Sequence, residues 1–375
     1  MSEQKNRLAE VAKLFAKLGA ISFGGPAAHI AMMEKEVVKK RKWMTQEHFL
    51  DLIGATNLIP GPNSTEMAIH CGYIRAGKLG LWIAGICFIF PAVAITLIFA
   101  WFYKQYGSLP AVEPFLYGIK PAVIAIILDA VFHFGKKALK NWQLGCIGLF
   151  VIAAVLIGAN VILIILIAGL TGILWFGKLS NSVKSIFPLI LFQVQSTLAS
   201  FSTTSLFLVF LKIGSVLFGS GYVLFGYLDS ELVRNLGWIT RQQLMDAVAV
   251  GQFTPGPVLS SAAFIGFQID GIMGAVAATV GIFLPSFIFI LILNPLIPKL
   301  RKSKIASAFL DSVNIASVAI MLAVTIQMGF TVLIDWKVWL IALLGIVSLL
   351  SLKNINSVWV IAGGVIIGYL LHLVG

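Results

Sequence analysis

Long runs of apolar residues alternate with short polar segments along nearly the whole chain. Such runs predict helices that cross a membrane, because about 20 apolar residues span the hydrocarbon core of a bilayer. Four runs lie in each half of the chain, at residues 79–103, 115–134, 142–159, 161–176, 272–296, 309–330, 336–352 and 358–374. The pattern therefore predicts an all-α polytopic membrane protein.

The residue order of the first half returns in the second half. A motif that begins Phe15-x-Lys17-x-Gly19 and ends Phe23–Gly24 recurs 195 residues later, from Phe210 to Gly219. That offset, reduced to 194 after one deletion, relates further positions: Trp43 to Trp238, Pro60–Gly61–Pro62 to Pro255–Gly256–Pro257, Gly77 to Gly271 and Pro91 to Pro285. We predict two tandem homologous halves, residues 1–177 and 206–375, joined by a linker at 178–205.

Each half also contains a Pro-Gly-Pro turn between two helical segments that are too short to span a bilayer. Proline removes an amide donor and disfavours a helix at the residue before it, so each turn stops the preceding helix. In the first half, Thr45 suits a helix N-cap, and the helix it starts runs to about residue 58. Another helix begins near Asn63. We predict a re-entrant hairpin or a broken helix at each turn, and a polar loop at residues 34–43.

The composition strengthens the membrane assignment, and the charge pattern adds an orientation. Of the 375 residues, 59% are hydrophobic and 11% are charged, whereas a soluble domain carries about 25% charged residues. The net charge of +12 does not indicate nucleic acid, because the basic residues cluster at the ends of apolar runs. The clusters at 35–42, 136–140 and 299–304 occupy non-equivalent positions in the two halves. Since basic loops usually face the cytoplasm, we expect inverted-topology repeats, with a parallel duplication as the alternative.

Two broken-helix turns at corresponding places in a membrane protein predict a transport site. A helix that starts after such a turn has free amide groups and the positive end of its dipole, which suit an anion. The candidate substrate ligands surround both turns and the end of the first helix: Asn57, Gly61, Asn63, Ser64, Thr65, Thr254, Gly256, Ser260, Ser261, Gly24 and Gly25. The alternative is a kink that only packs helices together.

Titratable residues near the turns are the remaining candidates. Lys17 and Lys212 are repeat-related and stand in apolar segments. Each is either a countercharge for the anion or a cation that reaches the membrane interface. Glu66 has no acidic counterpart in the second half, and we consider it a proton-coupling candidate together with His70 and His29. The alternative role of Glu66 is the acidic residue of a capping box at the start of its helix.

The sequence contains no nucleotide-binding loop, metal-ligand cluster or catalytic triad. We therefore expect no cofactor, no metal site and no enzyme activity. Cys71, Cys87 and Cys146 lack CxxC spacing and are interpreted as small hydrophobic residues. A membrane-embedded enzyme that uses Glu66 and His70, and a passive channel, are the alternatives from other functional classes.

These motifs resemble the chromate ion transporter family in its long two-domain form. The resemblance rests on residues 22–29, on residues 54–66 around the first turn, on Trp43 and on Pro255–Gly256–Pro257. It implies a multi-pass carrier of the inner (plasma) membrane that exports chromate with the proton motive force and so confers chromate resistance. Sulfate, a similar tetrahedral dianion, is the alternative substrate, carried by an importer or an exchanger.

The resemblance also sets the expected partners. They are chromate, with sulfate as the alternative, and the lipid bilayer, with a homodimer as a further expectation and no nucleic acid. The second half lacks the Asn-Ser-Thr-Glu run that follows the first turn. We therefore expect the first turn to select the ion and the second turn to complete the cavity.

Overall fold

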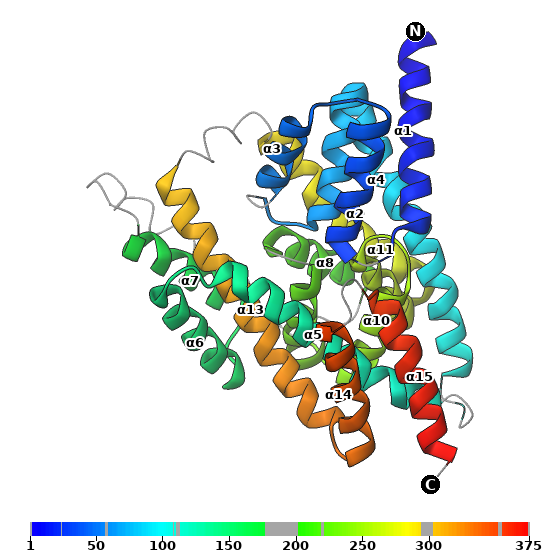
Figure 1. The fold of residues 1–375 in the computed structure, drawn as a ribbon, viewed down its shortest axis with the longest axis vertical. Coiled ribbons are helices and arrows are strands. Elements are labelled where there is room, and N and C mark those ends of the chain that lie inside the picture. The colour runs from blue at the N-terminus through cyan, green and yellow to red at the C-terminus, as the bar shows by residue number, and fades with distance from the viewer. Residues whose placement is uncertain are drawn as a thin grey trace.

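The computed structural model describes residues 2–23, 25–56, 59–107, 109, 113–176, 202–218, 221–293, 303–351 and 355–373. Every regular element in these ranges is a helix, which confirms the prediction of an all-α protein. Figure 1 shows the N-terminus at one end of the long axis and the C-terminus at the other. Most of the predicted linker, residues 178–201, lies outside the described ranges.

Most of the predicted apolar runs coincide with helices to within about five residues, whereas the runs at 79–103 and from 272 onwards are only the later parts of longer helices. The first half contains α1 (Ser2–Ile21), α2 (Gly25–Glu34), the π-helix η1 (Lys35–Lys40), α3 (Gln46–Thr56), α4 (Asn63–Tyr106), α5 (Glu113–Ala138), α6 (Trp142–Leu156) and α7 (Val161–Phe176). The second half contains α8 (Thr203–Val216), the 3-10 helix η4 (Gly221–Val223), α9 (Leu224–Leu228), the π-helix η5 (Asp229–Asn235), α10 (Arg241–Phe253), the 3-10 helix η6 (Val258–Ser260), α11 (Ser261–Leu293), α13 (Lys304–Val332), α14 (Trp336–Ser351) and α15 (Ser357–Leu373).

The short helix before each turn begins at the predicted cap. In the first half, the amide of His48 donates to the hydroxyl oxygen of Thr45 at 3.2 Å. In the second half, Thr240 and Gln243 form a complete capping box at the start of α10. A side-chain oxygen at this position satisfies amides that have no partner within the helix. The chain therefore starts both hairpin helices with the same local chemistry.

The polar loop predicted at residues 34–43 is wrong for most of its length, because Lys35–Lys40 form a π-helix. Two ion pairs stabilise this winding along its axis, Glu34 with Lys39 at 3.2 Å and Glu36 with Lys40 at 2.8 Å. The repeat-equivalent segment of the second half is also a π-helix. Polar composition alone suggested a loop, whereas the spacing of opposite charges allows a helical turn.

The helix that follows each turn continues into a long helix through a sharp kink. Within α4 the kink lies at Ala76 and Gly77, where Gly77 has a φ of 68°. Within α11 it lies at Asp270 and Gly271, where Gly271 has a φ of 58°. Glycine adopts a positive φ without steric penalty. Each half therefore contains a broken helix whose short arm leads away from the turn and whose long arm returns.

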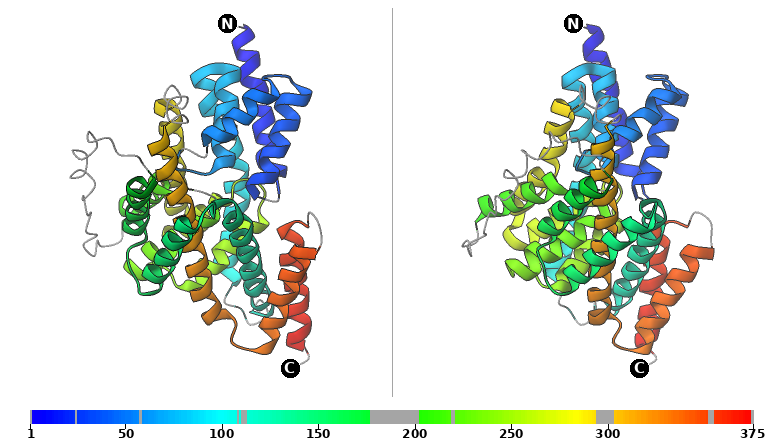
Figure 2. Two further views of the ribbon diagram at one scale, coloured as in Figure 1. Left: turned by 60° about the vertical axis from the view of Figure 1, so that its left-hand side comes forward. Right: turned by 90° about the vertical axis from the view of Figure 1, so that its left-hand side faces the viewer.

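The two halves are interlocked by an exchange of helices. The first-half helix α5 packs against α14 and α15 of the second half, while α13 of the second half packs against α6 and α7 of the first. The long helices α4 and α11 also pack against each other. The views in Figure 2 show these first-half and second-half helices side by side. The main hydrophobic core is consequently shared, with buried residues from both halves.

The repeat-equivalent helices α5 and α13 run in opposite directions. Lys140, just after the end of α5, pairs with Asp311 near the start of α13 at 2.7 Å. At the other end, the Tyr117 hydroxyl near the start of α5 donates to Asp335, just after the end of α13, at 2.6 Å. In Figure 2, α5 rises along the long axis while α13 descends.

Four helical segments are long and apolar enough to cross a membrane, Asn63–Tyr106, Tyr117–Ala138, Val258–Ile292 and Lys304–Val332. Large apolar side chains stand exposed along them, including Phe90 on α4 and Ile292 on α11. Contiguous exposed apolar surface of this kind suits lipid contact. The chain is therefore a multi-pass membrane protein.

Substitutions at two adjacent glycines of α15 test whether this helix packs closely against α5 of the other half. A β-carbon at Gly364 would lie 2.7 Å from the carbonyl oxygen of Gly118 on α5, whereas a β-carbon at Gly363 would meet nothing within 4 Å. We expect Gly364→Ala to destabilise the protein by about 1–3 kcal/mol, because overpacking forces the backbones apart. Gly363→Ala should be neutral or slightly stabilising, since alanine favours the helix. Thermal unfolding of the two purified variants measures the difference, and equal melting temperatures would contradict it.

Candidate functional site

Each Pro-Gly-Pro turn is fastened to the opposite half of the chain. The amide of Gly61 donates to the carbonyl oxygen of Leu217 at 2.6 Å, and the amide of Gly256 donates to that of Ser22 at 2.8 Å. The two hydrogen bonds are repeat equivalents, since the offset of 195 relates Ser22 to Leu217 and Gly61 to Gly256. Leu217 and Ser22 directly follow α8 and α1. Both turns therefore lie at the interface between the halves.

The first turn is surrounded by buried polar groups. Gly61 has a φ of 149°, and Pro62 is the N-cap of α4. Thr65 and Glu66 in the first turn of α4 are fully buried. Neither the Thr65 hydroxyl nor either Glu66 carboxyl oxygen has a hydrogen-bond partner among the described residues. Because buried polar groups are normally paired, these atoms mark a place where a ligand or water is expected.

The Glu66 side chain reaches back to the turn. Its Oε1 atom lies 2.4 Å from the point that a β-carbon at Gly61 would occupy. A capping box would need this carboxyl to accept from the amide of the N-cap residue. The N-cap is Pro62, which has no amide hydrogen. The capping-box alternative for Glu66 is therefore wrong.

A serine of the second half faces the same point. The hydroxyl oxygen of Ser286 on α11 also lies 2.4 Å from the position of a β-carbon at Gly61. Its side chain is buried, and its oxygen has no partner in the described part of the chain. Sequence reasoning missed Ser286. The available signal was its place after Pro285, the repeat equivalent of Pro91, at a proline inside a long helix.

The end of α1 supplies a second buried polar group. The carbonyl oxygen of Ser22 accepts from the Gly256 amide and lies 3.1 Å from Nε2 of His29, which therefore carries the proton. The His29 ring meets the ring of Phe88 edge-on, with centroids 5.8 Å apart. The Ser22 hydroxyl and Nδ1 of His29 have no partner among the residues described. His29 thus positions the Ser22 carbonyl group that accepts the hydrogen bond from the second turn.

The second turn differs because its hydroxyls bind one another. The Thr96 hydroxyl of α4 donates to Ser260 at 3.1 Å and lies 3.5 Å from Thr254. The Thr254 hydroxyl in turn contacts the carbonyl oxygen of Gly251 at 3.4 Å. Ser261 is buried, and its hydroxyl is the unpartnered one at this turn within the described residues. Most of the hydrogen-bond donors predicted at the second turn therefore already bond to other groups of the protein.

The remaining predicted ligands, and the proton-coupling candidate His70, are placed as follows. Ser64 and Gly25 are buried, and Asn63 is half-buried at the start of α4. His70 is buried one turn after Glu66, and its Nε2 has no partner in the described residues. The last two, Asn57 and Gly24, lie outside the described residues.

The two repeat-related lysines have different surroundings. Lys212 on α8 pairs with Glu231 on η5 at 3.0 Å, and the Glu231 side chain is 3% exposed. Lys17 on α1 is exposed and has no ion pair among the described residues. The repeat equivalent of Glu231 is Glu36, which instead binds Lys40 and Arg41. The ion pair between these repeat-related positions is therefore present in the second half, whereas in the first half Glu36 pairs with basic residues near it in the chain.

The stability effects of replacing each lysine by methionine should differ, because their surroundings differ. We expect Lys212→Met to lower the free energy of unfolding by about 3 kcal/mol, because it leaves the buried Glu231 carboxylate without its cation. Lys17→Met should change it by less than about 0.5 kcal/mol, as for an exposed surface position. Thermal unfolding in the same detergent measures both variants. A larger loss for Lys17→Met than for Lys212→Met would contradict the assignment.

Basic residues gather around Glu36 and Glu10 in the first half. The hydrogen bond from Lys40, with Arg41 beside it, holds the pKa of Glu36 below its usual range, because cations favour the charged carboxylate. Glu10 on α1 accepts from Arg75 at 2.7 Å and from the Trp43 indole at 3.2 Å. These contacts join α1, the segment before α3, and the short arm of α4.

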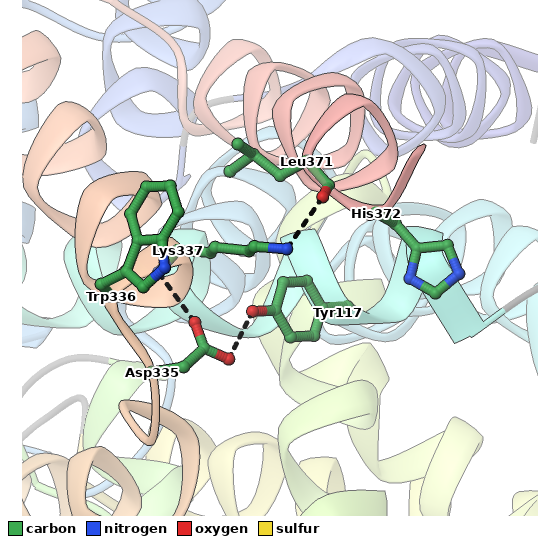
Figure 3. Close-up of a pocket in the computed structure, with 6 residues that line it drawn as sticks. All are labelled: Tyr117, Asp335, Trp336, Lys337, Leu371 and His372. Atoms are coloured by element: carbon green, nitrogen blue, oxygen red, sulfur yellow. Dashed lines mark hydrogen bonds between the residues drawn. The ribbon is translucent and has the colours of Figure 1, made fainter. Parts of the chain in front are cut away.

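A separate cavity of about 420 Å³ lies between α5, α14 and α15 (Figure 3). Asp335 accepts from the Tyr117 hydroxyl at 2.6 Å and from the Lys337 amide at 2.8 Å, and the bond from Tyr117 lowers the pKa of Asp335. The Lys337 ammonium donates to the carbonyl oxygen of Leu371 at 3.2 Å. Since these polar groups satisfy one another, the cavity has a structural explanation as a junction between the halves.

Comparison with known proteins gives one family for both halves. The model of a family described as chromate transporter matches residues 9–173 and again residues 204–369. A chromate transport protein of Cupriavidus metallidurans is 29% identical over 377 residues, 96% of this chain and 92% of that protein. A probable chromate transport protein of Synechococcus elongatus is 31% identical over 353 residues, 91% of this chain and 89% of that protein. No solved structure matches.

Proposed function

Since this chain belongs to the chromate transporter family, we propose that it is a secondary carrier that exports chromate across the inner membrane. The relatives named as chromate transport proteins, which align over most of the chain, support chromate as the substrate. A family of transporters, rather than of enzymes, agrees with the multi-pass helical architecture.

The observation that carries this proposal is the first turn at the interface between the halves. The Ser286 hydroxyl and the Glu66 carboxyl lie beside Gly61 there, the Thr65 hydroxyl is buried in the first turn of α4, and α4 begins with amides that have no partner within the helix. A tetrahedral dianion accepts several hydrogen bonds at once, and neutral donors can hold it in a site closed to water. Asn63, Ser64 and Thr65 supply further donors in this proposal, and the second turn completes the cavity.

Transport would then proceed by alternating access between inverted halves. The opposite directions of α5 and α13 support inversion. The two hairpin helices also differ in packing: α3 packs against α4 as α10 packs against α11, but α10 packs in addition against α5 and α15. Leu50 on α3 is 55% exposed, while its equivalent Met245 on α10 is 2% exposed. Exchange of these two arrangements between the repeats would open the site to the other side of the membrane.

Glu66 is the proposed group through which the proton gradient drives export. It is buried beside the turn and has no acidic equivalent in the second half. An ionisable residue inside a membrane is costly to bury and commonly serves a proton or ion pathway. His70 and His29 are the further proton-coupling candidates in this proposal. Export in this direction would give the cell resistance to chromate.

Membrane vesicles of known orientation test the proposal. Energised inverted vesicles that contain the protein should accumulate labelled chromate with saturation, and a protonophore should abolish the accumulation. Vesicles from cells without the protein give the background. Accumulation that does not saturate and ignores the protonophore would indicate a passive channel and contradict a coupled carrier.

Sulfate is the second candidate substrate, because hydroxyl and amide donors recognise tetrahedral shape and charge, which sulfate shares. Labelled sulfate in the same vesicles, with each anion competing against the other, separates the two. Sulfate uptake into right-side-out vesicles, without chromate uptake into inverted ones, would favour a sulfate importer.

A further inference from the structure

The clearest unexplained group beside the first turn comes from the second half of the chain. Ser286 stands on α11, directly after Pro285, and its side chain is fully buried. Its hydroxyl oxygen has no hydrogen-bond partner among the described residues. Because an unpaired buried hydroxyl is destabilising, we expect a hydrogen-bond partner to bind at this position.

Packing on the neighbouring residue holds Ser286 in place. The ring of Phe287 stacks on Trp82 of α4, with centroids 4.7 Å apart and planes 12° apart. The same ring fills the space above Gly85, where a β-carbon would lie 2.3 Å from it. These contacts fix the position of α11 against α4 at this level. The Ser286 hydroxyl is therefore held against the first turn.

The Ser286 hydroxyl and the Glu66 carboxyl lie close to the same point beside Gly61. The Ser286 hydroxyl oxygen and the Glu66 Oε1 atom each lie 2.4 Å from the position of a β-carbon at Gly61. The two oxygens are thus within twice that distance of each other. A hydroxyl can donate to the oxygen of a bound anion, and to the carboxylate when the anion has left. Because the hydroxyl has one proton, it can serve only one of these two acceptors at a time.

At the second turn an alanine stands in the place of Ser286. There a β-carbon at Gly256 would lie 2.7 Å from the β-carbon of Ala92, which is the repeat equivalent of Ser286. Both turns have the Pro-Gly-Pro sequence and reciprocal hydrogen bonds to the opposite half, so the Ser286–Ala92 pair is one of the differences between them. The serine therefore makes the first turn chemically different, at a position that the first half cannot supply to itself.

We propose that the hydroxyl of Ser286, contributed by the second half, is a substrate-binding donor of the first turn and hydrogen-bonds an oxygen of the bound tetrahedral oxyanion beside Gly61. This inference rests on the proposed function for the class of its ligand. It makes the site composite, because the turn comes from one half and this donor from the other. Binding at the first turn would then require the two halves to be together.

The test compares Ser286→Ala with a matched serine. Ser312 on α13 is equally buried, its hydroxyl also lacks a partner among the described residues, and it packs against Gly172 of α7. In proteoliposomes, Ser286→Ala should raise the KM for chromate at least about tenfold and change the maximal rate less, because it removes one hydrogen bond to a charged ligand. Ser312→Ala should stay within about twofold of wild type. Ser286→Cys, which keeps the size with a weaker donor, should fall between Ser286→Ala and wild type.

An unchanged KM in Ser286→Ala, or an equal rise in Ser312→Ala, would overturn the inference. Calorimetric titration of the purified proteins with chromate and with sulfate measures binding without transport. It therefore tests the role of Ser286 independently of the proposal that the protein exports chromate. If wild type binds either anion without transporting it, the export proposal fails, and a tenfold weaker Kd in Ser286→Ala still supports the inference. If wild type binds neither anion, the inference is overturned as well. Thermal unfolding confirms that each variant is folded.

Discussion

Glu66→Gln is expected to reduce chromate transport driven by a pH gradient to the background of empty liposomes. The amide keeps the size of the side chain but can neither take up nor release a proton. Glu66 is fully buried, and its carboxyl oxygens have no partner among the described residues, so no ion pair is broken by the change. Exchange of labelled for unlabelled chromate, without net proton movement, should persist. Proteoliposomes with an imposed pH gradient measure both activities.

Glu47→Gln is the matched control for this prediction. Glu47 lies on α3 in the same half, and its side chain is exposed. Removing its charge should leave both driven transport and exchange near wild type. Driven transport at the wild-type rate in Glu66→Gln would exclude Glu66 as the coupling group and direct attention to His70 and His29. Loss of exchange together with driven transport would indicate a role in binding the anion.

Gly61→Ala is expected to lower chromate flux about 100-fold. The new methyl group would lie 2.4 Å from both the Glu66 carboxyl and the Ser286 hydroxyl, so it would push these two side chains of the proposed site out of position. Gly61 also has a φ of 149°, which a residue with a β-carbon adopts only at a cost of about 1–3 kcal/mol. Labelled chromate uptake at equal amounts of reconstituted protein measures the loss.

Gly77→Ala is the control that distinguishes backbone strain from steric overlap as the cause of the Gly61→Ala effect. Gly77 has a φ of 68° at the kink of α4, but a β-carbon there would meet nothing within 4 Å. It should therefore lower the melting temperature and leave most of the flux. Equal loss of flux in both variants would attribute the Gly61 effect to backbone strain and remove the evidence that space beside Gly61 is needed.

Much of the fold was predictable because its signals are local. The apolar runs predict α5 (Glu113–Ala138) and α7 (Val161–Phe176) closely, since length and hydrophobicity decide whether a segment can cross a bilayer. Thr45 and Asn63 mark helix starts through the chemistry of single residues. The π-helix at Lys35–Lys40 was not predictable, because its polar composition is shared by loops.

The candidate site was predictable only in part. The first turn, Thr65 and Glu66 follow from a polar break in an apolar chain, and the structure places them together at a buried position. Ser286 was missed because it becomes a neighbour of Gly61 only when α11 packs across the interface between the halves. Lys212 stands in an apolar segment, yet its partner Glu231 lies on a different element that pattern alone does not align with it.

The sequence by itself determined the membrane class, the duplication and the position of both Pro-Gly-Pro turns, since these depend on composition, self-similarity and the backbone chemistry of proline and glycine. Only the tertiary structure decided that each turn is bound by the opposite half, through Gly61 to Leu217 and Gly256 to Ser22. It also decided that the first turn faces a serine and a carboxyl that has no partner in the described part of the chain, while the second faces hydroxyls that bind one another. The physical reason is that two similar turns acquire different surroundings from the side chains packed against them, and this packing joins residues that lie far apart in the chain.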